Sequence, residues 1–140
     1  MTSRAFRQID VFGSGPFTGN PVAVVLGADD LDTEAMKRIS AWTNLSECTF
    51  VLAPTDPAAD YRVRIFSLTT GLPFAGHPTL GTARAWLDAG GVPANAGRVI
   101  QECGVGLVPV RLDADGTTLA FAAPALIRGG EVEADVLADV

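Results

Sequence analysis

Two short stretches of this 140-residue chain carry side chains suited to proton transfer. The single histidine, His77, lies in LPFAGHPTLG, residues 72–81, directly ahead of an alanine-rich segment. Glu47 lies in TNLSECTFV, residues 43–51, between a predicted helix and a predicted strand. A carboxylate at such a junction is partly removed from water, which lets one side chain both accept and release a proton. Together the two stretches point to acid/base chemistry.

Each of these residues also has a purely structural interpretation. His77 can simply cap its own helix, and a glutamate between a helix and a strand is usually just exposed. Cys48 is more typical of a small buried apolar residue than of a nucleophile, because no second base is near it in the sequence. The residues alone leave these alternatives open.

The helix expected to begin at His77 or Pro78 offers an anion-binding end. Pro78 at the first helical position costs no hydrogen bond, and the backbone N–H groups from Thr79 onward would point to whatever lies in front. Such a helix end attracts a carboxylate. The glycine spacing also imitates a phosphate-binding loop, but the required lysine is missing, so nucleotide binding is excluded.

The elements that must position these residues can be read from the apolar patterns. Alternating or β-branched residues predict strands, with loop chemistry in GSGPFTGN. The expected strands cover 6–12, 21–26, 48–54 and 61–68, with two or three more within 98–113 and 117–124 joined by a turn at 113–116. Strands outnumber helices and come as hairpins. This pattern favours an α+β fold with a curved, mostly antiparallel sheet.

Two helices are expected. The first covers residues 32–44, with Asp32 as its N-cap and Ala35, Ile39 and Trp42 on its apolar face. The second follows His77 and is apolar around most of its surface, so it should be a central helix wrapped by the sheet. Gly90 and Gly91 provide its C-terminal signal.

Composition excludes several classes of protein. The net charge is −6 and the ten basic residues are scattered, so nucleic acid is not an expected partner. No apolar run approaches the roughly 20 residues that span a membrane, and the start of the chain has no secretion signal. Cys48 and Cys103 have no neighbours at metal-ligand spacing. We therefore expect a soluble cytoplasmic protein without a metal site.

Four motifs together resemble a known family. IDVFGSGPFTGNPVAVVL, WTNLSECTFVL, YRVRIFSL and LPFAGHPTLGTARAWL follow one another as in the N-terminal half of the PhzF-like isomerases of phenazine biosynthesis, whose fold is related to diaminopimelate epimerase. The resemblance covers residues 6–125. It implies two similar halves with a site in the cleft between them. On this basis residues 1–125 form one domain, and 126–140 are a linker and the start of a helix leading toward an absent second half.

The resemblance also implies roles for particular residues. Glu47 would move a proton on and off carbon without metal or organic cofactor, while Ser46 and His77 hold the substrate. The backbone at Gly76 would approach the substrate, and Asn20 would border the cleft. With the helix end included, the expected substrate-binding residues are Asn20, Ser46, Gly76, His77, Pro78 and Thr79. Ala75 stands where related epimerases have a cysteine, which disfavours two-thiol racemisation.

The resulting hypothesis is an isomerase that transfers a proton on a small unsaturated or amino carboxylic acid. Its site would be completed by a second copy of the chain or by a complementary half-chain. One alternative is a non-catalytic binding or assembly domain that keeps the fold. A third hypothesis, a racemase that uses Cys48, is weaker.

Overall fold

The computed structural model describes residues 3–12, 14–113 and 119–121, which form two helices and a single curved sheet. In chain order the elements are β1 (Phe6–Val11), β2 (Asn20–Val25), α1 (Thr33–Thr43), β3 (Cys48–Leu52), β4 (Tyr61–Ser67), β5 (Thr70–Leu72), α2 (Gly76–Asp88), β6 (Arg98–Cys103), β7 (Gly106–Leu112) and β8 (Leu119–Phe121). The sheet order is β1-β2-β3-β4-β6-β7-β8, with β5 beside β4. Among these strands only the β2–β3 and β4–β6 pairings are parallel. The predicted α+β class and mostly antiparallel sheet are confirmed.

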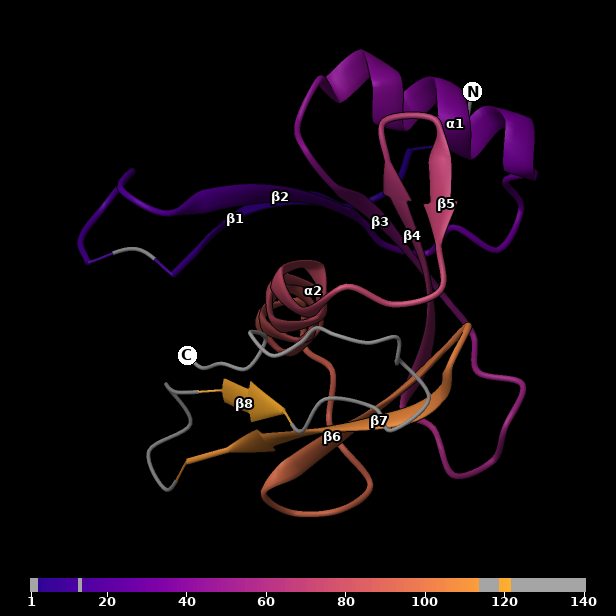
Figure 1. Cartoon of the computed structure of the whole chain (residues 1–140). Helices are drawn as coiled ribbons and strands as arrows, with labels where there is room; N and C mark the ends of the chain where they lie inside the picture. Colours follow the sequence, from indigo (N-terminus) through magenta and orange to yellow (C-terminus); the bar gives the residue numbers. More distant parts are fainter. Residues whose placement is uncertain (1–2, 13, 114–118, 122–140) are drawn as a thin grey trace.

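Helix α2 lies in the hollow of the curved sheet (Figure 1). It packs against β1, β2, β3, β6 and β8, so strands from both ends of the sheet reach it. Val22, Val63 and Val110 are among the buried residues that form one core cluster with it. Gly81 permits the close approach to β2, because a Cβ atom there would lie 2.2 Å from Cγ1 of Val22. The predicted central helix is therefore confirmed.

The start of α2 differs from the prediction. The helix begins at Gly76, and Ala75 is the N-cap, in extended conformation and without a side-chain hydrogen bond. Pro78 is thus the third helical residue, where its missing N–H has no partner within the helix in any case. The N–H of Thr79 donates to the carbonyl of Ala75 at 3.2 Å and closes the first turn. His77 is therefore not the N-cap, and the N–H of Thr79 is not free.

The end of α2 follows the predicted signal. Gly90 adopts a φ of +101°, which a side chain rarely tolerates. Its N–H donates to the carbonyl of Leu87 at 3.0 Å, and the N–H of Gly91 donates to that of Trp86 at 2.9 Å. These two bonds make a Schellman motif.

Helix α1 covers the other face of the sheet, over β3 and β4 (Figure 1). Its predicted cap is confirmed, since Oδ1 of Asp32 accepts from the N–H of Ala35 at 2.8 Å. The predicted apolar face is wrong at Trp42, whose exposure is 84%. Met36 and Ser40 are the buried residues of the helix, so the face toward the sheet is centred on them instead. The second core cluster lies between this face and the sheet.

The smaller differences fall at element ends. No sequence signal marks β5, which is three residues long and follows Leu68 in left-handed conformation, with φ +52°. Strands β7 and β8 pair antiparallel as predicted, with Leu112 opposite Leu119. Most of the predicted turn between them, and the linker and helix start expected at 126–140, lie outside the described residues.

Candidate active site

The site forms where three elements begin at the same edge of the sheet. Because β2 and β3 are parallel neighbours, their N-terminal ends lie at one edge. Asn44 ends α1 in left-handed conformation, with φ +58°, and the short turn after it leads to Glu47, directly before β3. The N–H of Ala23 in β2 donates to the carbonyl of Glu47 at 3.3 Å. The first turn of α2 brings His77 to this edge.

His77 is held at both ring nitrogens. Nδ1 lies 2.8 Å from Oε1 of Glu47, and Nε2 lies 2.9 Å from the backbone carbonyl oxygen of Asn20. The side chains of His77 and Glu47 are 13% and 20% exposed, so the contact is largely but not completely buried. The structure therefore brings together three of the residues that we expected at the site.

These contacts determine where protons lie on His77 and Glu47. A carbonyl oxygen can only accept, so Nε2 must carry a proton to bond Asn20. Nδ1 then either accepts a proton from a neutral Glu47 carboxyl or donates one to its carboxylate. In both cases a single proton lies between Nδ1 and Oε1. The geometry thus couples Glu47 and His77 as a proton-sharing pair.

The two oxygens of the Glu47 carboxyl group have different surroundings. Oε1 accepts from Oγ of Ser46 at 3.1 Å in addition to its contact with His77. Within the described part of the chain, no residue forms a hydrogen bond with Oε2. Ser46 is therefore a hydrogen-bond partner of Glu47, and Oε2 is the oxygen without a partner among the described residues.

The remaining predicted residues divide between the site and the core. Gly76 and His77 supply backbone N–H groups that have no partner within the helix, and these replace the donors that we expected from Thr79. Pro78 and Thr79 are buried, and Oγ1 of Thr79 donates to the carbonyl of Ala75 at 2.8 Å. The geometry thus gives the Thr79 side chain an internal role. Gly76 is required by packing, because a Cβ atom would lie 2.6 Å from Cζ of Phe121.

Sequence reasoning missed two residues near the site. The ring of Phe12 lies 6.1 Å from that of His77, centroid to centroid, and is 56% exposed. Its φ of +65° is unusual for a bulky residue. Thr18 ties the following loop together, since its Oγ1 accepts from the N–H of both Ser14 and Gly15. Neither feature has a sequence signal beyond the glycine-rich loop itself.

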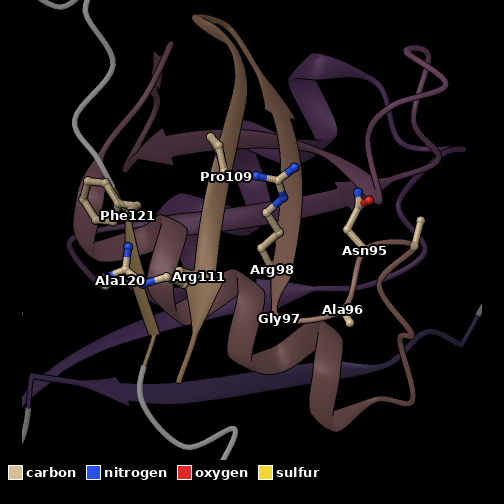
Figure 2. Close-up of a pocket in the computed structure, with 9 residues that line it drawn as sticks. Asn95, Ala96, Gly97, Arg98, Pro109, Arg111, Ala120 and Phe121 are labelled. Carbon is tan, nitrogen blue, oxygen red and sulfur yellow. The ribbon is translucent and has the colours of Figure 1, made fainter. Parts of the chain in front are cut away.

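Glu47 and His77 line neither of two surface hollows of the described residues. One, of about 430 Å³, is lined by Gln8, Asp10, Phe17, Gly19 and Pro21 on the β1–β2 hairpin. The other, of about 690 Å³, lies over β6, β7 and β8 (Figure 2). There Arg98 and Arg111 stand opposite each other on adjacent strands. Neither hollow contains a predicted catalytic residue.

Cys48 is not suited to nucleophilic chemistry. The residue is fully buried at the start of β3, on the face of the sheet that α1 covers. Burial raises the pKa of its thiol to about 12, so the thiol stays protonated at neutral pH. This geometry gives no support to a racemase based on Cys48.

The fold is that of the diaminopimelate epimerase-like proteins, of which the chain forms one half. The model of the family described as phenazine biosynthesis-like protein (PhzC-PhzF) matches residues 9–125. The chain belongs to this family, and the resemblance that the motifs suggested is confirmed.

Three relatives illustrate the match. Antisense-enhancing sequence 1 of Schizosaccharomyces pombe is 46% identical over 89% of this chain and 43% of its own length. The trans-2,3-dihydro-3-hydroxyanthranilate isomerase of Pseudomonas aeruginosa is 47% identical over 80% of this chain and 39% of its length. The crystal structure of a PhzF-family phenazine biosynthesis protein from Bacillus anthracis aligns with a TM-score of 0.73 at 29% identity, covering 86% of this chain and 40% of that one. The chain thus spans less than half the length of these relatives.

Two structural signatures, a metal-binding cluster and a membrane-spanning helix, are absent from the described residues. Within residues 3–12, 14–113 and 119–121, no group of three or more His, Cys, Asp or Glu side chains is arranged to hold a metal ion. Neither α1 nor α2 is long and apolar enough to cross a membrane.

Proposed function

We propose that this chain forms one wall of an isomerase site, in which Glu47 transfers a proton on a small unsaturated or amino carboxylic acid. The observation that carries the proposal is the coupled pair, with Oε1 of Glu47 bound to Ser46 and His77 and Oε2 left open. Membership of a family that includes a named isomerase supports the same class of reaction.

The proton and the electron pair are both accounted for in this reaction without a cofactor. Oε2 of Glu47 takes a proton from a carbon of the substrate, and the electron pair of the broken C–H bond enters the conjugated system. The double bond shifts, and the same proton returns to a different carbon. His77 stabilises both states of Glu47, because the proton between Nδ1 and Oε1 can move toward either atom as charge develops.

The start of α2 supplies a place for the carboxylate of the substrate. The N–H groups of Gly76 and His77 are open donors at the positive end of a 13-residue helix. They follow Ala75 directly, and one of them belongs to the residue that contacts Glu47. A substrate carboxylate bound there would place the adjacent carbons near Oε2, which favours small carboxylic acids as the class of substrate.

We propose that a second copy of the chain or a complementary half-chain completes the site. Phe12 and Phe17 flank the loop beside the site and are 56% and 98% exposed, an arrangement typical of a surface that is covered by a partner. Sedimentation should show a dimer, or a complex with a half-chain, and Phe17→Ser should weaken it. A strictly monomeric chain that binds no half-chain would contradict this part of the proposal.

Incorporation of deuterium from solvent tests the chemistry directly. Wild-type chain, alone and with a half-chain partner, is incubated in D₂O with small unsaturated hydroxy and amino acids, and exchange is followed by mass spectrometry. Glu47→Gln keeps a hydrogen-bonding group beside His77 but cannot carry the proton, so exchange should fall by about 10²–10⁴-fold while binding survives. Glu34→Gln, on the exposed side of α1, is the matched control and should exchange at the wild-type rate.

The same experiment distinguishes the proposed isomerase from a non-catalytic binding or assembly domain. A wild-type protein that binds such acids but never exchanges deuterium, with any partner, is a binding or assembly domain rather than an enzyme. Exchange that persists in Glu47→Gln would assign the proton transfer to another residue.

A further inference from the structure

A chain of buried hydrogen bonds leads from the core to the residue that starts α2. Oη of Tyr61 donates to Oε1 of Gln101 at 3.1 Å, and Nε2 of Gln101 donates to Oγ1 of Thr79 at 3.0 Å. Oγ1 of Thr79 in turn donates to the carbonyl of Ala75 at 2.8 Å. Tyr61 is 1% exposed, and Gln101 and Thr79 are 0% exposed. These bonds connect β4 and β6 to the N-cap of α2.

The direction of every bond in this series is fixed. The Ala75 carbonyl can only accept, so the Thr79 hydroxyl must donate to it and accept from Gln101. The Gln101 carbonyl oxygen then faces Tyr61, whose pKa is raised by burial, so the phenol stays protonated as a donor. Buried bonds of this kind specify one arrangement, because any other leaves a polar atom unsatisfied in the core.

The hydrogen bonds reach α2 at its N-cap, which has no side-chain cap. Ala75 has no side chain that can cap the helix, and no side-chain cap is present. Its carbonyl is instead held by both the N–H and the Oγ1 of Thr79. Gly76 and His77 follow at once, so the position of Ala75 sets where the open N–H groups and the His77 ring lie.

We propose that Thr79 and Gln101 are positioning residues, which fix the first turn of α2 so that His77 contacts Glu47 and the Asn20 carbonyl at the same time. The proposal rests on the function proposed above for Glu47 and His77, and it assigns Thr79 a place behind the site instead of a contact with substrate. Neither residue touches the reacting atoms. Each acts through the backbone of Ala75.

The test measures the state of the His77 ring directly by NMR. Because it is the only histidine of the chain, its imidazole ¹⁵N signals can be assigned without ambiguity. Thr79→Val removes the hydroxyl at nearly constant volume, and Thr79→Ser restores it. Gln101→Met removes the hydrogen bond from Gln101 to Thr79. This second variant replaces Thr79→Val in the test if Thr79→Val does not fold. Met36→Val, in the core cluster beneath α1, is the control for a general loss of stability.

In the wild type and in Thr79→Ser, we expect the Nε2 signal at the shift of a protonated ring nitrogen. In Thr79→Val and Gln101→Met this signal should move toward the tautomeric average. Met36→Val should lower thermal stability and leave the His77 signals unchanged. Deuterium exchange of an accepted substrate should fall by about a hundredfold in Thr79→Val, in line with misplacement of a reactive group.

Unchanged His77 signals in Thr79→Val or Gln101→Met would overturn the inference, whatever the stability of the variant. So would an equal change of these signals in Met36→Val, because the effect would then follow stability and not position. The NMR measurement needs no substrate. A wild-type chain without exchange activity therefore refutes the proposed function separately from the positioning role.

Discussion

Glu47 and His77 share one hydrogen bond of 2.8 Å, between Oε1 and Nδ1, and this bond contains a proton in either charge state of the pair. The constraint comes from the opposite side of the ring, where the Asn20 carbonyl accepts from Nε2 at 2.9 Å. Two residues that are 30 positions apart in the chain are thus joined by one shared proton.

The first prediction concerns the tautomer of His77. We expect Nε2 to carry a proton, because its partner, the Asn20 carbonyl, can only accept. Long-range ¹H–¹⁵N correlation spectra of the wild type and of Glu47→Gln should both show protonated Nε2. A neutral ring that carries its proton on Nδ1 in the wild type would contradict the proton count.

The second prediction concerns the close approach of α2 and β2. Gly81→Ala places a Cβ atom 2.2 Å from Cγ1 of Val22 and 3.2 Å from Cγ2 of Val11. The free energy of unfolding should fall by about 1–3 kcal/mol through overpacking, although alanine is the better helix former. Chemical denaturation measures the effect. Gly15→Ala is the control and should be neutral, because a Cβ atom there would meet nothing within 4 Å.

The third prediction concerns the reactivity of Cys48. Burial of the Cys48 thiol raises its pKa to about 12. Iodoacetamide should therefore leave this thiol unmodified until the protein unfolds. The reaction is run at about pH 8, close to the ordinary pKa of a thiol. A folded-state pKa above the unfolded value means that stability is lost as the pH rises from about 9 toward 12. Mass spectrometry of the alkylated native protein checks the first statement. Rapid alkylation of Cys48 in the folded protein would support the hypothesis of a racemase that uses Cys48.

The fourth prediction concerns acid stability. Hydrogen bonds from Arg4 lower the pKa of Asp30 to about 2 from an ordinary value of 3.8. Because the folded-state pKa is the lower one, the stabilisation is present above about pH 4 and is lost as the pH falls toward about 2. Asp30→Asn and Arg4→Gln should each flatten the dependence of unfolding free energy on pH in this interval. Retention of the full wild-type slope in both variants would show that other carboxylates cause it.

Much of the fold could be predicted because its signals are local. The alternation in residues 61–68 correctly predicts that Tyr61, Val63 and Ile65 share one face, and in the structure this is the face toward α2. Asp32 and the glycines after α2 mark helix ends, because caps are properties of a few adjacent residues. The prediction for Trp42 is wrong because a helical period defines an apolar stripe but not how the helix is rotated on the sheet, where Met36 and Ser40 are the buried residues.

The site could be predicted in part. The family motifs indicate Ser46, Glu47 and His77, and in the structure Ser46 and His77 each form a hydrogen bond with Oε1 of Glu47. The Asn20 carbonyl and the hydroxyl of Thr79 could not be assigned, because backbone acceptors and buried hydrogen bonds depend on which strands meet. The predicted start of α2 is too late for the same reason, since the Ala75 carbonyl is anchored by a residue of its own first turn and, through Gln101, by β6.

The hydrogen bond between Nε2 of His77 and the backbone carbonyl of Asn20 has a consequence for substitutions at position 20. A main-chain oxygen is present whatever the residue type, so the orientation of the imidazole does not depend on the side chain at position 20. That side chain is exposed beside the site and makes no hydrogen bond with the described residues. We therefore expect that a substitution at position 20 can alter what binds there without altering the orientation of the His77 ring.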